Sequence, residues 1–103
     1  MNTDIVFHQP TVQVTINNKE LYTHHFKAVN IGNTLINKLS VTKGCSCTEV
    51  VCPAEIKPNE EFEVVVIIDK RKDKGIFSVG AIIEFDNGQR IKLNVGGKIE
   101  QHD

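Results

Sequence analysis

Apolar and polar residues alternate with a period of two along most of this chain of 103 residues, and the 3.6-residue period of an amphipathic helix is hard to find. In residues 11–16 every second position is valine or isoleucine, so these side chains share one face of an extended segment. A polar turn at residues 17–20 separates this segment from a second one, residues 21–30. The pattern predicts an all-β chain that begins with this pair of strands.

The middle of the chain contains two further strand patterns and one interruption. A third strand is expected over residues 35–42, and it runs directly into the segment that holds the cysteines. Residues 53–60 contain two prolines and little alternation, which predicts a connection from one sheet to another and excludes a central strand there. Residues 62–68 are dense in β-branched side chains, so we expect a strand in the middle of a sheet with both faces covered.

The C-terminal part of the chain has the pattern of a hairpin. Residues 76–85 and 89–99 flank the sequence Asp86-Asn87-Gly88, and asparagine and glycine accept the positive φ angles that tight hairpin turns require. The count is then about seven strands. The economical way to bury their apolar faces in one domain, residues 1–103, is an Ig-like β-sandwich of two antiparallel sheets. The chain has no tryptophan, so the antibody pattern of cysteines around a buried tryptophan is absent.

Composition argues against several partners. Hydrophobic residues make up 40% of the chain and charged residues 24%, which is ordinary for a globular domain. The formal net charge is −1 and both signs are interspersed, so no nucleic-acid partner and no attraction to an anionic membrane are expected. The basic run within residues 69–75 lacks the aromatic or glycine-rich neighbours of a phosphate or nucleic-acid site, and we interpret it as a solvated loop.

The sequence also bears on the compartment. No apolar run approaches the roughly 20 residues that span a bilayer, so no transmembrane segment is expected. Residues 1–7 lack the basic and apolar blocks of a signal peptide. We therefore expect a cytoplasmic protein if Met1 is the native start, and a periplasmic or cell-surface protein if a leader has been removed.

All three cysteines, Cys45, Cys47 and Cys52, lie within eight residues of one another. In an extended strand, residues i and i+2 have Cα atoms nearly 7 Å apart, so Cys45 and Cys47 would not bond to each other comfortably. A disulfide from Cys52 to either of them is easier. The chain-entropy model values both loops at about 2 to 2.5 kcal/mol, which does not choose between them. In a reducing cytosol all three thiols would stay free.

Metal binding and redox chemistry are the alternatives for these three cysteines. Two thiolates in Cys-x-Cys converge on a soft ion such as copper or zinc if the backbone turns, with Cys52 as a third ligand. The upstream candidates for a fourth ligand are His8, His24 and His25. His24 and His25 would face opposite sides of a strand, and none of the three has the spacing of a familiar zinc motif. A redox enzyme would favour Cys-x-x-Cys at the start of a helix. We predict no catalytic residues and no cofactor.

Three short motifs in a fixed order carry a family resemblance: Asn30-Ile31-Gly32, Cys45-Ser46-Cys47-Thr48 and Pro58-Asn59-Glu60. Together they resemble a bacterial Ig-like family of unknown function with a Cys-Gly-Cys motif, which is similar to ASH, MSP and Hydin domains. The resemblance runs from about Phe26 to Val95. Ser46 stands where the family usually has glycine, and Asn59 replaces the glycine of the second turn. Asparagine tolerates a left-handed conformation, so this turn should survive.

The resemblance implies an exported protein, because members of this family are commonly lipoproteins or parts of larger envelope proteins. No enzymatic activity is established for the family. We therefore expect a non-enzymatic binding or structural module of the bacterial cell envelope. Its protein partner is unknown, and contact would be made through a strand edge or a sheet face. The same edges allow a weak homo-oligomer. The alternative function is a thiol-based metal or redox protein that uses the three cysteines.

Overall fold

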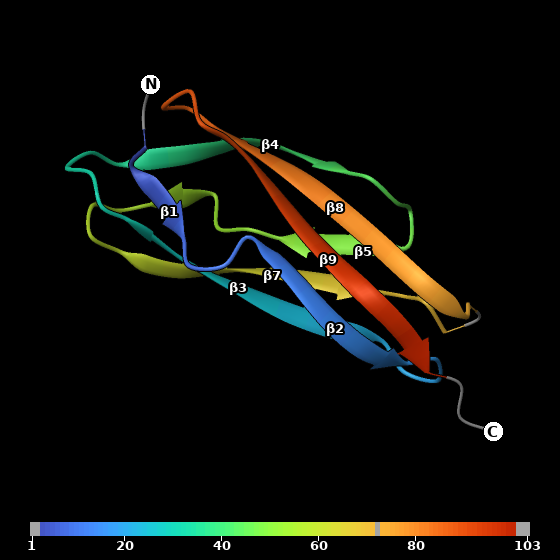
Figure 1. Cartoon of the computed structure of the whole chain (residues 1–103). Helices are drawn as coiled ribbons and strands as arrows, with labels where there is room; N and C mark the ends of the chain where they lie inside the picture. Colours follow the sequence, from blue (N-terminus) through green and yellow to red (C-terminus); the bar gives the residue numbers. More distant parts are fainter. Residues whose placement is uncertain (1–2, 72, 101–103) are drawn as a thin grey trace.

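Two β-sheets pack face to face in the computed structural model, which describes residues 3–71 and 73–100 (Figure 1). The described residues form nine strands: β1 (Ile5–Phe7), β2 (Thr11–Asn17), β3 (Tyr22–Asn30), β4 (Ile36–Lys43), β5 (Thr48–Val51), β6 (Glu55–Ile56), β7 (Glu61–Ile68), β8 (Gly75–Phe85) and β9 (Arg90–Glu100). The four-stranded sheet has the order β1-β3-β7-β5, and the five-stranded sheet has the order β2-β9-β8-β4-β6. The all-β sandwich predicted from the alternation is confirmed.

The longest strands, β8 and β9, have eleven residues each and run side by side along much of the molecule, whose principal extents are 51 × 20 × 20 Å (Figure 1). They form the expected hairpin, and Gly88 in its turn has a φ of 92°. Such a positive φ is easy for glycine, which lacks a Cβ atom. No helix in the described part of the chain could cross a membrane.

The prediction that residues 11–16 and 21–30 pair with each other is wrong. β2 pairs with β9 in parallel, from Thr11 opposite Asn94 to Asn17 opposite Glu100, whereas β3 pairs with β1 and β7 in the other sheet. The expectation of purely antiparallel sheets fails at the same ladder. Alternation shows only that each strand buries one face. Two strands that face each other across a core have the same alternating pattern as two strands that are neighbours in one sheet, so the pattern does not identify a strand's partner.

β7 lies between β3 and β5, so the expectation of an internal strand over residues 62–68 is confirmed. The expectation that both of its faces are covered is wrong. Its inward side chains are buried, while Val65 and Ile67 are only half-buried and Glu61 and Glu63 are exposed. No element of the described chain packs on the outer face of this sheet, because the fold has only two layers.

Residues 53–60 carry the chain from β5 in one sheet to β6 in the other and back to β7, as the two prolines predicted. β6 is a two-residue strand at the edge of the five-stranded sheet. The turn that follows has Pro58 at its second position and Asn59 at its third, and Glu60 N–H donates to the Lys57 carbonyl at 3.1 Å. Asn59 has a φ of 65°, as expected from its tolerance of the left-handed region.

A fully buried asparagine joins this turn to the end of β3. The Asn30 amide nitrogen donates to the carbonyl oxygens of Thr34 at 2.9 Å, Ile56 at 3.3 Å and Lys57 at 3.2 Å, and its amide oxygen accepts the N–H of Gly32 at 3.0 Å. Each polar atom of the Asn30 side chain is thereby satisfied, as burial requires. The Asn30 side chain of the first family motif is therefore bonded to Ile56 and Lys57, the two residues directly before the third motif.

Candidate functional site in the cysteine turn and at the β2 edge

Cys45 and Cys47 form a disulfide in the turn between β4 and β5, and their Cα atoms are 5.2 Å apart. β4 ends at Lys43, the chain bends at Gly44, and β5 begins at Thr48, so the two cysteines do not lie on an extended strand. The prediction that Cys52 takes part in the disulfide is wrong. It assumed that β4 continues straight through the cysteines, whereas the turn shortens the distance between their Cα atoms.

Cys52 is a free thiol, buried just beyond the end of β5. Burial raises its pKa to about 11, against the opposing influence of the nearby Lys38 charge. The four residues of β5 separate it from Cys47, and a strand rises about 3.3 Å per residue, so roughly 13 Å of strand lies between them. The three cysteines therefore do not form one site.

Backbone hydrogen bonds hold this turn independently of the disulfide. Gly44 N–H donates to the Gly80 carbonyl at 2.9 Å, Thr48 N–H to the Cys45 carbonyl at 3.2 Å, and Asp69 N–H to the Cys47 carbonyl at 2.8 Å. A Cβ atom on Gly44 would lie 3.2 Å from the Gly80 oxygen, so glycine permits the close approach to β8.

Each sulfur of the disulfide also has a hydrogen-bonding neighbour. Cys47 N–H donates to Cys45 Sγ at 3.1 Å, and the hydroxyl of Thr48, a buried side chain, lies 3.5 Å from Cys47 Sγ. The two cysteine side chains are half-buried against the core, and Ser46 between them is exposed. The turn thus presents a disulfide whose sulfurs already have polar neighbours.

His24 and His25, two of the candidates for a further metal ligand, lie on β3 and not in the cysteine turn. His24 faces the core side of β3, where its ring packs against Phe26 at a centroid distance of 4.6 Å and its Nδ1 lies 2.8 Å from the Tyr22 hydroxyl. Burial lowers the pKa of His24. His25 lies on the outer face, 2.8 Å from Glu63, so the two histidines face opposite sides as expected. In the described residues, no three histidine, cysteine, aspartate or glutamate side chains are grouped to hold a metal ion.

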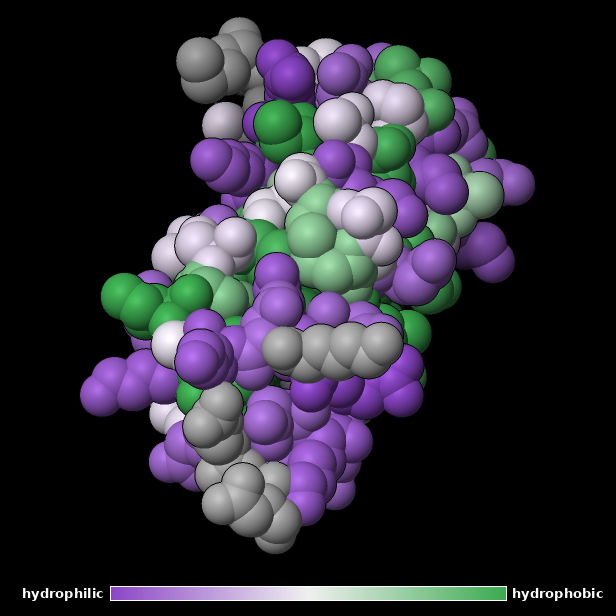
Figure 2. Space-filling model, turned by 90° about the vertical axis from the view of Figure 1, so that its right-hand side faces the viewer, coloured by the Kyte–Doolittle hydropathy of each residue, from purple (hydrophilic) through white to green (hydrophobic). Residues whose placement is uncertain are grey.

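The basic run at residues 69–75 covers the connection between β7 and β8 and the first residue of β8, at the end of the molecule that Figure 2 shows. Hydrophilic side chains dominate the lower half of that view. Arg71 makes a bidentate pair with Asp69 through contacts of 2.9 and 2.8 Å, and Lys70 lies 3.3 Å from Asp73. Lys72 lies outside the described residues.

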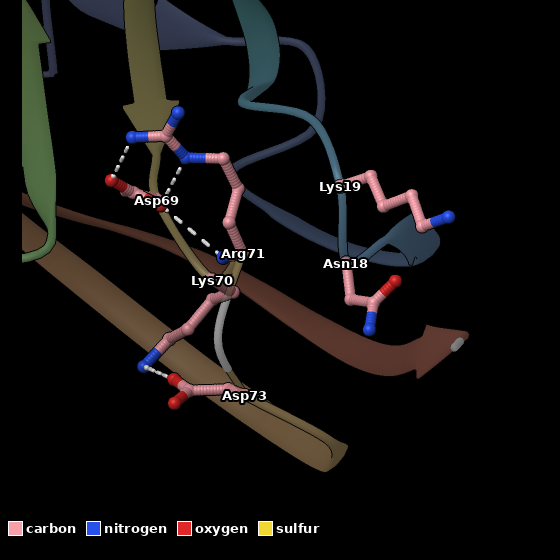
Figure 3. A pocket seen from close by; sticks show the side chains of 6 residues that line it. All are labelled: Asn18, Lys19, Asp69, Lys70, Arg71 and Asp73. Carbon is pink, nitrogen blue, oxygen red and sulfur yellow. Dashed lines mark hydrogen bonds and ion pairs between the residues drawn. The ribbon is translucent and has the colours of Figure 1, made fainter. Parts of the chain in front are cut away.

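An open hollow of about 700 Å³ lies at this end of the sandwich, and Figure 3 shows the side chains around it. Asn18 and Lys19, from the turn after β2, lie opposite the paired charges of the β7–β8 connection. Because the cations Lys70 and Arg71 are compensated within their own loop, the interpretation as a solvated loop agrees with the geometry.

The edge strand β2 is the feature that sequence reasoning missed. Asn94 N–H donates to the Pro10 carbonyl at 2.9 Å, and Asn18 N–H donates to the Glu100 carbonyl at 3.0 Å, at the two ends of the β2–β9 ladder. In a parallel ladder a strand bonds to its neighbour through every second residue. The even-numbered residues of β2 therefore bond to β9, and the backbone N–H and C=O groups of Thr11, Gln13 and Thr15 point away from it.

No described strand pairs with this outer side of β2. The strand has seven residues, none of them charged and none of them proline, so it lacks the usual protection of a sheet edge. The other edge strands of the two sheets are shorter, with three residues in β1, four in β5 and two in β6. The absence of charge in residues 11–17 is the signal in the sequence, but the alternation predicts residues 21–30 as the partner of this strand.

A shallow hollow of about 310 Å³ lies beside the middle of β2 and is lined by Gln13, Val14, Thr15, Gly97 and Lys98. Val12 and Ile16 are buried in the core, whereas Val14 between them is only half-buried. The β2 edge therefore offers open backbone groups beside a partly exposed apolar side chain.

A family model described as "Protein of unknown function (DUF1573)" matches residues 5–99. The chain belongs to the DUF1573 family. The match confirms the resemblance inferred from the three motifs and extends it toward both ends of the chain. No sequence among the curated proteins matches this DUF1573 chain.

Solved structures share the fold at low sequence identity. The ASH/PapD-like domain of human CEP192 (PapD-like domain 7) has a TM-score of 0.77 at 10% identity, over 98% of this chain and 88% of that one. A protein of unknown function from Porphyromonas gingivalis W83 has a TM-score of 0.78 at 14% identity, over 91% and 46%. The VesB protease of Vibrio cholerae has a TM-score of 0.67 at 12% identity, over 92% and 32%. The DUF1573 chain spans less than half of the last two, and these likenesses concern the fold alone.

Proposed function

We propose that this DUF1573 domain is a non-enzymatic protein-binding module that accepts an extended segment of another protein as an additional strand beside β2. The observation that carries the proposal is the open backbone of Thr11, Gln13 and Thr15 on an uncharged edge strand. Main-chain pairing with a sheet edge gives affinity without any special side chain, which suits a chain in which the sequence offers no catalytic constellation.

Side-chain contacts would come from the hollow beside β2. A strand added to this edge alternates its side chains between the two faces of the sheet, so every second one would lie beside the half-buried Val14. An apolar residue at that position of the partner removes Val14 from water. We therefore expect ligands with alternating apolar residues and little charge.

The proposed setting is the cell envelope. The Cys45–Cys47 disulfide supports an oxidising compartment, because glutathione and thioredoxin keep thiols reduced in the cytosol. Fractionation of cells that express the native gene with its own upstream sequence would test this setting. Recovery of the protein in the envelope fraction with Cys45 and Cys47 oxidised is expected, and recovery only in the cytosol with three free thiols would contradict it.

Binding by strand addition can be tested with a displayed library of random linear peptides selected on the immobilised domain. A synthetic form of a selected peptide is then N-methylated at one backbone nitrogen at a time. We expect affinity to fall about tenfold or more at alternate positions and to change little at the positions between them, because only every second N–H of an added strand faces β2. Uniform tolerance of N-methylation would contradict strand addition.

Variants of the domain locate the edge. Gln13→Pro removes an N–H that points away from β9, whereas Gln13→Ala changes only the exposed side chain. The alanine variant should bind the selected peptides as the native domain does, and the proline variant should lose binding while keeping its circular dichroism spectrum. Peptides that bind the folded proline variant with native affinity would exclude the β2 edge.

A further inference from the structure

We propose that the Cys45–Cys47 disulfide is a thiol–disulfide exchange site, which a dithiol of a partner protein opens and closes while the domain stays folded. The site lies between β4 and β5, on the side of the sandwich away from β2, because β2 and β4 are separated by β9 and β8 in the five-stranded sheet. The proposal is therefore independent of strand addition, and each can fail without the other.

Both redox states keep the turn, because the backbone bonds around it do not involve sulfur. The three bonds from Gly44, Thr48 and Asp69 anchor the turn to β8, to itself and to the end of β7. The disulfide spans only three residues, so its loss releases little loop entropy to the unfolded chain. Opening this disulfide removes a local link without removing a contact between distant strands.

The neighbours of the two sulfurs favour release of a thiolate. Cys47 N–H points at Cys45 Sγ from 3.1 Å. A hydrogen bond donated to a thiolate stabilises this charged form and so lowers the pKa of the thiol. A thiol of lower pKa leaves faster in disulfide exchange. Attack on Cys47 Sγ expels Cys45 Sγ toward this donor, so Cys47 is the expected point of attack.

The exchange can be written with its electrons balanced. A thiolate of the partner dithiol attacks Cys47 Sγ, the bond between Cys47 and Cys45 breaks, and its electron pair passes to Cys45 Sγ. This attack leaves a mixed disulfide between the partner's first sulfur and Cys47 Sγ. The partner's second thiol then attacks the partner's first sulfur and expels the Cys47 thiolate. The partner leaves as a disulfide, oxidised by two electrons, and Cys45 and Cys47 take up the two protons.

Cys52 takes no part, since it is buried and roughly 13 Å of strand separates it from Cys47. The Cys52→Ser variant of the full chain is therefore the appropriate background for the test. In this variant every thiol that is counted belongs to the pair.

The experiment equilibrates the Cys52→Ser protein in buffers of graded reduced and oxidised glutathione, and counts thiols by the mass added on alkylation. Structural disulfides resist reduction by the glutathione pool. We expect two thiols to appear together within the accessible range of glutathione ratios, with an unchanged circular dichroism spectrum. A pair that stays oxidised at every ratio, or that opens only with loss of the folded spectrum, would overturn the proposal.

The direction of attack is tested separately with single-thiol variants, each in the Cys52→Ser background. Cys47→Ser leaves Cys45 with its backbone donor, and Cys45→Ser leaves Cys47 beside the Thr48 hydroxyl. The pH profiles of alkylation should give the Cys45 thiol a lower pKa than the Cys47 thiol. A disulfide with a purely structural role would require no such difference between its two thiols. Equal profiles, or the lower pKa at Cys47, would overturn the assignment of Cys47 as the point of attack.

Discussion

Asn59 N–H donates to the backbone carbonyl of Asn30 at 2.8 Å, so the turn before β7 is bonded directly to the end of β3. The Asn30 N–H donates in turn to the Glu60 carbonyl at 3.0 Å. These two backbone bonds and the buried Asn30 amide hold together two motifs that are about thirty residues apart in the chain. The motifs therefore act as one structural unit at this end of the sandwich.

Asn30→Ala should lower the free energy of unfolding by roughly 1–3 kcal/mol, because it leaves the Gly32 N–H and buried carbonyl oxygens without their partner. Urea unfolding followed by circular dichroism measures the change. Asn30→Asp is the matched variant, since it keeps the size but replaces the donating nitrogen with an acceptor. A native-like stability for the aspartate variant would show that the three donated bonds contribute little.

Asn59 provides a test of the left-handed turn. Asn59→Ala should destabilise the fold by about 1 kcal/mol, because a residue with a Cβ atom and no local hydrogen-bonding group resists a φ of 65°. Asn59→Gly should leave the stability within a few tenths of a kcal/mol of the native value or raise it. Thermal unfolding of the two variants side by side makes the comparison. The reverse order of stability would refute the role assigned to the backbone angle.

The sequence pattern located the strands more reliably than it located their partners. The alternation in residues 11–16 and 21–30 predicts β2 and β3. It does not show that Val12 and Phe26 belong to different sheets and point into the core from opposite sides. Pairing depends on the path of the chain through the turns. The topology, and not the alternation, therefore identifies β2 as an uncharged edge strand.

The cysteine turn and the Asn30 contacts illustrate the same limit. Cys45 follows a clear strand pattern, and nothing in residues 43–47 except Gly44 signals that the strand has ended. The disulfide follows from a local bend that spacing alone does not reveal. The motif around Asn30 predicted a turn, but its bonds to Ile56 and Lys57 exist only because the crossing connection passes the end of β3.

Gly97 is required where β9 passes β2. Its φ is 148°, and a Cβ atom there would lie 1.7 Å from the Val14 carbonyl oxygen, which is backbone and cannot move without disturbing the ladder. Gly97→Ala should therefore cost about 3 kcal/mol or more. Gly80→Ala is the control, since the nearest atoms would be 3.5 Å away, and it should change stability by no more than about 0.5 kcal/mol. Equal unfolding midpoints for the two variants would contradict this reading of β9.

The disulfide should contribute little to stability. The chain-entropy model assigns about 1.6 kcal/mol to a loop of three residues. The Cys45→Ser, Cys47→Ser double variant should therefore remain folded, with unfolding shifted by about that amount, because the backbone bonds of the turn persist. Denaturant titration of the oxidised native protein and the double variant measures the difference. A double variant that fails to fold would show that the disulfide is essential to the turn and would count against its opening in the native state.

Cys52 predicts a dependence of stability on alkaline pH. Burial raises its folded-state pKa from an ordinary value near 9 to about 11, so the unfolded chain loses this proton at lower pH than the folded chain does. The contribution of Cys52 to the free energy of unfolding is then fully present below pH 9. It falls by on the order of 2 kcal/mol as the pH rises toward 11. Cys52→Ala removes the titrating group.

The measurement for Cys52 is the difference in unfolding free energy between the native protein and Cys52→Ala at several values from pH 7 to pH 11. Every other titratable group is common to both proteins, so its contribution cancels in the difference. We expect the advantage of the native protein to shrink above pH 9. A difference that stays constant across the range would mean that the Cys52 thiol ionises equally in the folded and unfolded states.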